Sequence, residues 1–424
     1  MDAFLQKKLE QCLERVALLL ASRAAQASGS PLSAAAALAQ FFQVCRSWRA
    51  VSYSQSLWRR LCLSIWNRDA QLRESSWHQT FITLHRTAVN FSTGSAERYL
   101  LDSDSLANHN DATASCRRLA ISSDHLAGGF SDGSLCVFSL DSKDCVCSFQ
   151  TFHESVIGTH SRTIIGIILP DDEETVTFAC MDGSVFKADI APGAPCRRVL
   201  MGNYVEDGIL ADFSGNASKW AGLYAGVRGR ALRVWDAYSE ELVYVGGCMT
   251  DADAYAGWTM LVDNADNIGR VKVTRDRLLV VATRSKLCVM DMEALTILLD
   301  ISLSRSLQVI PASLALQDKY MLLVSGSGVV RILGTESAQE VASFSLGMHI
   351  RGSTVFGAMN SWHLMVNSRD ILHVWDFPSI RRPYRLATGL TDVTDLVCND
   401  NNIAIACGSG EEQGIHIWDF TPRP

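Results

Sequence analysis

The stretch His363-Leu-Met-Val-Asn-Ser-Arg-Asp-Ile-Leu-His-Val-Trp-Asp-Phe377 contains an apolar run, a polar turn, and a second apolar run that ends in Trp-Asp. Two short apolar runs joined by a tight polar turn are typical of a β-hairpin. The same pattern recurs at 220–236 and 403–419. Four weaker copies lie between these, at residues 126–139, 176–189, 279–291 and 322–334. The chain therefore repeats one hairpin unit along most of its length.

The spacing of these copies predicts the fold. The positions aligned with the aspartate of Trp-Asp are 139, 189, 236, 291, 334, 376 and 419, so successive copies lie 50, 47, 55, 43, 42 and 43 residues apart. A period in the forties, with four strands in each repeat, is typical of a WD-type β-propeller. We therefore predict an all-β propeller with seven blades over residues 116–424. The strand pattern excludes an α-solenoid, and a β-sandwich would not repeat at this length.

The end of the last repeat carries a further expectation. The chain stops soon after Trp418-Asp-Phe420, which would end the third strand of the last blade. A closed ring needs an outer strand for that blade, because the sheet edge would otherwise be open. The segment between Ala88 and Leu101 is the expected donor. We expect residues 91–115, which are polar, to be a linker that donates this strand.

The first 90 residues have a different character and predict helices. Residues 3–27 are rich in Ala, Leu, Glu, Gln and Arg, which favour helix formation. Gly29-Ser-Pro31 would end that helix and start another, whose apolar residues recur at three- and four-residue spacing. Two further helical segments follow, near residues 57–65 and 77–90. We therefore predict a small all-α module over residues 1–90, with its core motif at 31–66.

Composition and motifs argue against several classes of function. A net charge of −7 disfavours direct nucleic-acid binding. The 13 cysteines form no Cys-x-x-Cys pair, which fits a reducing compartment and no disulfide framework. The chain has no apolar run of about 18 residues, so no membrane span is predicted. The apolar run at 16–21 is too short for a signal peptide. We find no zinc-ligand spacing and no phosphate loop followed by a helix. We therefore expect no catalysis, cofactor, metal or membrane contact.

Binding surfaces are the remaining expectation. The turns between the second and third strands of the blades should share one rim, which would be basic over blades three to six and acidic at Asp132, Asp182, Glu411 and Glu412. Guanidinium groups suit acidic or phosphorylated peptides. An insertion at 248–270 adds aromatic residues beside them. The candidate rim residues are Arg228, Arg230, Arg284, Lys286, Arg369, Tyr255 and Trp258. The alternatives are turns charged only for solubility and a Trp258 that folds back to cap the ring.

The helical segment also resembles a known module. The phrase Phe42-Gln-Val-Cys-Arg-Ser-Trp-Arg-Ala-Val-Ser52, followed by Ser56-Leu-Trp-Arg-Arg-Leu61, is similar to the second half of an F-box. The family's opening Leu-Pro is absent. The resemblance implies binding to a Skp-type adaptor and, through it, to a cullin. The residues at the family's motif positions are Val44, Cys45, Trp48, Leu57, Trp58 and Leu61. The alternative is a helical bundle that packs on the ring and binds no partner.

The whole chain resembles the plant STERILE APETALA family. The similarity rests on the F-box-like phrase, Ile65-Trp66, Arg86-Thr-Ala-Val-Asn-Phe91 and His125-Leu-Ala-Gly-Gly-Phe-Ser-Asp-Gly133. It implies a substrate-recognition subunit of a Skp–cullin–F-box ubiquitin ligase that binds transcriptional regulators of flower and organ development. It also implies a nuclear location, with or without a cytoplasmic pool. The alternative function is a WD-repeat scaffold or transcriptional co-regulator that assembles partners without degradation.

Overall fold

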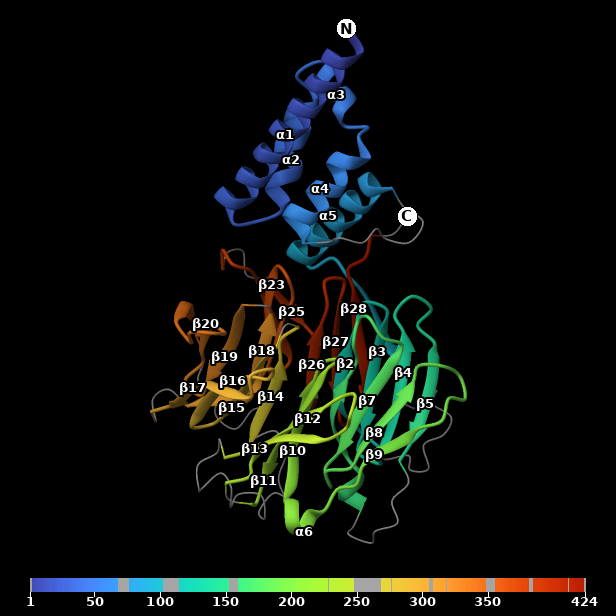
Figure 1. Cartoon of the computed structure of the whole chain (residues 1–424), viewed down its shortest axis with the longest axis vertical. Helices are drawn as coiled ribbons and strands as arrows, with labels where there is room; N and C mark the ends of the chain where they lie inside the picture. Colours follow the sequence, from blue (N-terminus) through green and yellow to red (C-terminus); the bar gives the residue numbers. More distant parts are fainter. Residues whose placement is uncertain are drawn as a thin grey trace.

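A helical module stands on one edge of a β-propeller (Figure 1). The computed structural model of the chain describes residues 2–67, 76–101, 114–151, 159–227, 229–247, 268–275, 277–304, 308–317, 319–347, 355–380, 384–410 and 412–422.

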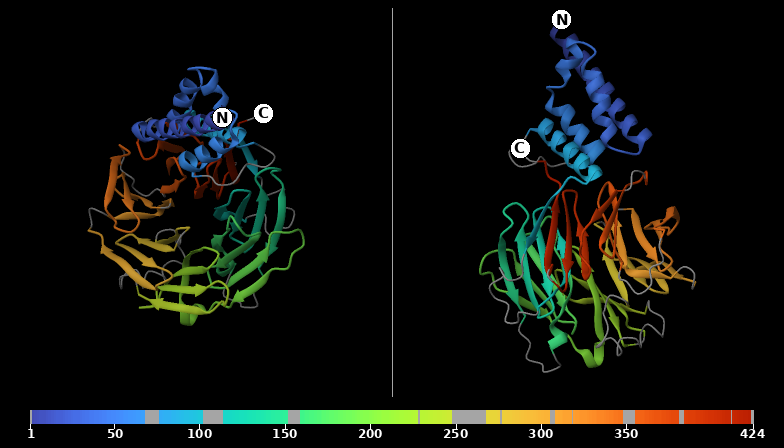
Figure 2. Two further views of the ribbon diagram at one scale, coloured as in Figure 1. Left: turned by 45° about the horizontal axis from the view of Figure 1, so that its top comes forward. Right: turned by 180° about the vertical axis from the view of Figure 1, so that it is seen from behind.

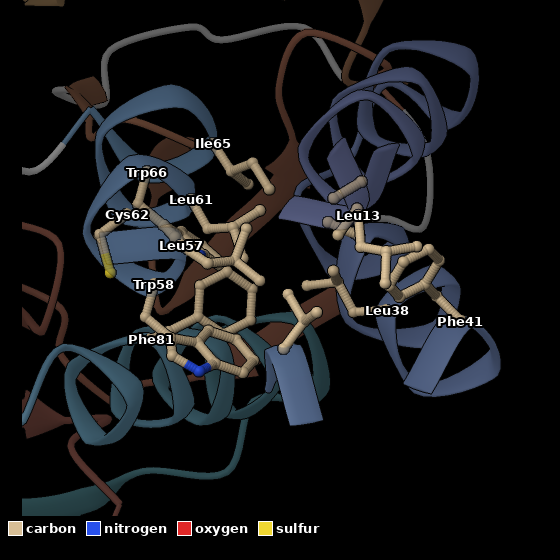
Figure 3. Close-up of a cluster of buried hydrophobic side chains, with 14 of the residues drawn as sticks. Leu13, Leu38, Phe41, Leu57, Trp58, Leu61, Cys62, Ile65, Trp66 and Phe81 are labelled. Atoms are coloured by element: carbon tan, nitrogen blue, oxygen red, sulfur yellow. The ribbon is translucent and has the colours of Figure 1, made fainter. Parts of the chain in front are cut away.

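The helical module consists of α1 (Asp2–Ser28), α2 (Leu32–Phe42), α3 (Arg46–Val51), α4 (Gln55–Trp66) and α5 (Trp77–Thr93). Gly29 follows α1 with a φ of +64°, a left-handed conformation that glycine adopts without strain. The hydroxyl of Ser54 accepts a hydrogen bond from the N–H of Leu57 and so caps α4. The apolar faces of the helices meet in one core, part of which is drawn in Figure 3.

The propeller consists of seven four-stranded antiparallel sheets. The first strands are β2 (Cys116–Ile121), β6 (Ile164–Ile168), β10 (Ile209–Gly215), β14 (Gly269–Val273), β18 (Val309–Gln317), β22 (Val355–Met359) and β26 (Val393–Cys398). The second strands are β3 (His125–Phe130), β7 (Thr175–Cys180), β11 (Lys219–Ala225), β15 (Leu278–Thr283), β19 (Tyr320–Ser325), β23 (His363–Ser368) and β27 (Asn402–Cys407). Each first strand contacts the first strands of both neighbouring blades, so the ring is closed around a central axis.

The third strands are β4 (Ser134–Ser139), β8 (Val185–Asp189), β12 (Leu232–Asp236), β16 (Lys286–Asp291), β20 (Val329–Gly334), β24 (Ile371–Asp376) and β28 (Gly414–Asp419). The outer strands of the first six blades are β5 (Cys145–Gln150), β9 (Arg197–Leu200), β13 (Leu242–Gly246), β17 (Thr296–Ser302), β21 (Glu340–Ser345) and β25 (Tyr384–Ala387). All seven third strands end at the positions aligned in the sequence, so the predicted fold class is confirmed.

The terminal aspartate of a third strand holds the turn that follows it. Asp236 Oδ1 accepts hydrogen bonds from the N–H groups of Tyr238 and Ser239, both at 3.0 Å. Asp291 caps its turn in the same way, although the residue before it is methionine. The tryptophan of the repeat is therefore more replaceable than the aspartate, because several apolar residues can fill a buried site whereas few can accept two backbone hydrogen bonds.

The fourth strand of the last blade comes from the N-terminal part of the chain. Strand β1 (Glu97–Leu101) pairs antiparallel with β28, with Tyr99 opposite Ile417. This pairing covers the edge of the last sheet. The end of α5 lies only a few residues before β1, so the strand also connects the helical module to the ring. Of the expected linker at 91–115, residues 102–113 lie outside the described residues.

The module is mounted on blades six and seven. The Phe91 ring, 1% exposed, stacks on His363 at a centroid distance of 4.8 Å and on Phe420 at 3.8 Å. Trp66 packs edge-to-face against Trp362, which belongs to the turn between β22 and β23. We call the side of the ring that carries the turns between first and second strands the module-side face. The opposite side, which carries the turns between second and third strands, is the far face.

Burial of His363 under the module makes stability depend on pH. Desolvation lowers the pKa of His363 from 6.5 to about 4, although Asp376 Oδ1 lies 3.7 Å from Nε2. Between pH 6.5 and pH 4 the unfolded chain takes up a proton that the folded chain does not. His363 therefore does not reduce the free energy of unfolding above pH 6.5. Between pH 6.5 and pH 4 it lowers that free energy by about 1.4 kcal/mol for each unit by which the pH falls.

We expect the Tm of the wild type to fall more steeply between pH 6.5 and pH 4.5 than that of His363→Phe. Phenylalanine retains the stacking on Phe91 and has no proton to gain. Thermal unfolding across this range measures the difference, and parallel curves for the two proteins would contradict it.

Candidate functional site

Three of the six F-box-like motif residues lie at the surface of the module. The side chain of Val44 is 61% exposed and that of Cys45 is also exposed, at the junction of α2 and α3. Trp48 is half-buried, and its ring lies 4.3 Å from that of Phe41. These residues are accessible to a partner protein. An exposed apolar side chain beside a half-buried tryptophan is typical of an interface.

The other three motif residues are buried in the core of the module. Leu57 and Leu61 have no exposed area, and Trp58 is 5% exposed. The indole N–H of Trp58 donates a 2.7 Å hydrogen bond to the carbonyl of Ser52, and its ring packs on Phe81 (Figure 3). Any contribution of these residues to adaptor binding is therefore indirect, through the fold that positions Val44.

An apolar surface on α1 was not among the residues singled out from the sequence. Leu13, Ala17 and Ala21 form its buried face. The flank beside this buried face exposes Leu9 by 47%, Val16 by 40%, Leu19 by 60% and Leu20 by 43%. Four exposed apolar residues on one side of a helix form a patch that a partner can cover. The sequence contains evidence for this patch, because the apolar residues of α1 spread around more of the helix than one buried face requires.

On the far face, the described residues of the predicted basic rim differ in their availability. Arg230, Arg284 and Arg369 are exposed in the turns of blades three, four and six. Arg369 has a φ of +58° and sits in a two-residue turn. Lys286 is 16% exposed, and its ammonium lies 3.0 Å from Asp300 Oδ1 on the neighbouring strand. Lys286 is therefore committed to an ion pair within its own blade.

Four other residues expected at the rim lie outside the described residues: Arg228, Tyr255, Trp258 and Glu411. Asp132 and Asp182, expected to give an acidic arc, instead accept hydrogen bonds within their turns, from the N–H groups of Ser134 at 2.9 Å and Ser184 at 2.8 Å. Asp182 is 5% exposed. Asp182 is therefore mostly withdrawn from the surface of the rim, whereas Asp132 is half-buried, and both carboxylates support their turns.

Four buried charges cross the central axis of the ring. Arg270 Nη1 lies 3.4 Å from Asp212 Oδ1, and its Nη2 lies 3.8 Å from Asp395 Oδ1. Arg118 Nε lies 3.9 Å from the same oxygen of Asp212. All four side chains are less than 10% exposed. They come from the first strands of blades one, three, four and seven, so this charge cluster joins blades that are not neighbours.

Metal and membrane sites were also considered. Within the described residues, no group of three or more His, Cys, Asp and Glu side chains is placed to hold a metal ion. No helix in the described ranges is both long and apolar enough to cross a membrane.

Comparisons with known proteins agree with this arrangement. Residues 30–64 match the F-box-like family model, which covers α2, α3 and most of α4. The β-propeller domain of Cps50 (Swd1) from Myceliophteria thermophila is similar in fold, with a TM-score of 0.51 and 13% identity over 73% of this chain and 97% of that domain. The chain is thus an F-box-like propeller protein. F-box domains generally bind Skp-type adaptors, and this architecture is typical of non-catalytic receptor subunits.

A relative defines the family more narrowly. The transcriptional regulator STERILE APETALA of Arabidopsis thaliana is 32% identical over 412 residues, which cover 97% of this chain and 91% of the relative. The chain belongs to the STERILE APETALA family.

Proposed function

We propose that this chain is the substrate-recognition subunit of a Skp–cullin–F-box ubiquitin ligase. The observation that carries the proposal is an F-box-like segment whose own continuation, α5 and β1, is packed into the ring of a propeller. The module would bind the adaptor and, through it, the cullin, while the ring holds a protein substrate. Its contribution is to raise the effective concentration of substrate lysines near a recruited transferase.

Family membership supports a proposal for the class of targets. The Arabidopsis relative carries the description of a transcriptional regulator and a name that refers to sterile, apetalous flowers. These words support a nuclear location and targets among the transcriptional regulators of plant flower or organ development. The same description favours the second candidate function, a scaffold or co-regulator that assembles partners without degrading them.

The proposed adaptor surface combines the exposed motif residues with α1. Val44, Cys45 and Trp48 would contact the adaptor directly, together with the α1 patch of Leu9, Val16, Leu19 and Leu20. Leu57, Trp58 and Leu61 would support that surface from the core.

We expect Val16→Asp combined with Leu20→Asp to reduce co-purification of a Skp-type adaptor at least tenfold. Each carboxylate would lose its hydration in the interface without gaining a partner, and a tenfold loss corresponds to only about 1.4 kcal/mol. The matched control is Leu242→Asp on β13, where leucine is 46% exposed on the ring. Unchanged adaptor binding by the double variant would contradict this surface, and a wild type that binds no adaptor would favour the scaffold.

A second expectation concerns the substrate rim. We propose that Arg230, Arg284 and Arg369 contact an acidic or phosphorylated substrate, with Lys286 held in place by its ion pair and Arg228, Tyr255 and Trp258 as further candidates. Charge-assisted hydrogen bonds contribute about 1.5–3 kcal/mol each. We therefore expect a variant with Arg230→Glu, Arg284→Glu and Arg369→Asn to lose substrate capture at least 100-fold, measured by quantitative proximity labelling.

Asparagine is chosen at position 369 because it tolerates positive φ. The matched control is Lys319→Glu, which reverses an exposed charge in the turn between β18 and β19 on the module-side face. Identical labelled proteins for the wild type and the rim variant would show that these turns are charged for solubility alone.

A further inference from the structure

A blind pit opens at the centre of the module-side face. Its volume is about 620 Å³, and none of the residues that line it belongs to the helical module. The module stands over one edge of the ring, and Figure 2 shows the centre of the ring beside it. The wall combines apolar and polar residues and is contributed by several blades. Its half-buried apolar residues include Ile121, Ile167, Leu169, Val273, Leu316 and Val397.

The charge cluster closes the floor of the pit. Leu119 and Leu396 line the pit, and the cluster residues Arg118 and Asp395 directly precede them on strands that run toward the module-side face. Arg118 also donates from Nε to the carbonyl of Ile165 at 2.8 Å. A polypeptide chain therefore cannot thread through the ring at this level. A polypeptide can therefore enter the pit from the module side only as a side chain, a turn or the end of a chain.

One cation in the wall of the pit lacks an ionic partner among the described residues. Lys272 is half-buried on β14, two positions after Arg270, and no described carboxylate lies within salt-bridge distance of its ammonium. The second cation of the lining, Arg275, is 80% exposed and already pairs with Asp171 at 3.0 Å. A partly desolvated ammonium beside apolar side chains favours a ligand that carries both an anionic group and an apolar group.

We propose that the pit binds the C-terminal end of a partner polypeptide whose last residue is apolar. The terminal carboxylate would pair with Lys272, and the last side chain would cover the wall formed by Ile167, Val273 and Leu316. A chain end fits a pit with a closed floor, and its terminal carboxylate lies next to its last side chain. It can therefore pair with the Lys272 ammonium, which has no carboxylate partner among the described residues, while the side chain contacts the wall. A cavity of about 620 Å³ lies within the range of about 300–1,000 Å³ that is usual for ligand sites.

This site is separate from the far-face rim and does not depend on adaptor binding. A partner end held there would lie on the side of the ring that carries the module rather than across the ring from it. The pit could therefore capture a partner even if the ring bound no substrate at its far face, and the two sites are tested by different variants.

The test is a selection with the full chain against random heptapeptides displayed with free C-termini, followed by fluorescence polarisation of a selected peptide. The affinity of each peptide and of its C-terminal amide is measured for the wild type, for Lys272→Met and for Ala120→Trp. Methionine retains the aliphatic packing of lysine without its charge. Ala120 is half-buried and lines the pit, so tryptophan there would fill it. Arg198→Glu, which reverses an exposed charge on the outer strand β9, is the matched control.

We expect selected peptides to end in an apolar residue and to bind at least tenfold more weakly to Lys272→Met and to Ala120→Trp. Binding to Arg198→Glu should be unchanged. Amidation of the peptide should weaken its binding to the wild type by the same factor. It should not weaken binding to Lys272→Met any further, because amidation and the substitution remove the same carboxylate–ammonium interaction. Equal binding of acid and amide would overturn the proposal. A selection without binders sensitive to Ala120→Trp would overturn it as well, and circular dichroism of each variant excludes misfolding as the cause.

Discussion

Asp212→Asn is expected to lower the free energy of unfolding of the ring by about 3–5 kcal/mol, the usual cost of removing one partner from a buried ion pair. The Asp212 carboxylate accepts a 2.7 Å hydrogen bond from the N–H of Val271 and lies within 4 Å of both Arg118 and Arg270. Asparagine has nearly the same shape but no charge. Two buried guanidinium groups would then share the cluster with Asp395 as its remaining anion.

Urea unfolding followed by tryptophan fluorescence measures this loss. The matched control is Asp172→Asn, an exposed aspartate at the mouth of the pit, where we expect a change within about 0.5 kcal/mol. The double variant Asp212→Asn with Arg270→Met should lose less than the sum of its single variants, because the second change removes a charge that the first left uncompensated. A loss below about 1 kcal/mol for Asp212→Asn would contradict a stabilising role of the cluster.

Phe91→Ala is expected to release the helical module from the ring, with a loss of about 3–5 kcal/mol in the stability of their junction. The phenyl ring is 1% exposed between His363 and Phe420, so its removal leaves a cavity at the main contact between the two parts. The neighbouring Asn90, which donates a 2.9 Å hydrogen bond to the carbonyl of Phe420, would lose its support.

Small-angle scattering should show a larger maximum dimension for Phe91→Ala, and limited proteolysis should cut near Gly94, where α5 ends. The matched control is Val89→Ala on the same helix, because Val89 is 37% exposed. If the variant scattered and digested like the wild type, Trp66 and β1 would be sufficient to hold the module.

The packed junction matters for the proposed function because it sets where bound partners lie. The module is mounted over blades six and seven, the pit opens beside it, and the arginine turns face the other way. In a ligase receptor, these two faces would present a captured protein at different distances from the adaptor. The Phe91→Ala variant therefore also tests whether substrate transfer needs a fixed orientation or only tethering.

Much of the candidate adaptor surface could be located from the sequence, but its division into core and surface could not. The motif spacing identified Val44, Trp48 and Leu57 together. Only packing shows that Leu57 is enclosed by α1 and α5 whereas Val44 is 61% exposed. Helical periodicity describes one helix at a time and does not reveal which neighbour covers it.

The blade count and the end of each third strand could be read from the sequence, because the hairpin pattern is a local feature that recurs along the chain and an aspartate stands at five of the seven strand ends. The His363–Phe377 stretch was sufficient to align copies that had lost their tryptophan, and each third strand ends where that alignment placed it. The tertiary structure alone decided what closes the central channel. Arg270 and Asp395 lie far apart in the chain and meet only when the ring closes, so their charges could not be paired from spacing. The pit depends on the same closure, and so does the position of Lys272, which has no carboxylate partner in the described part of the chain.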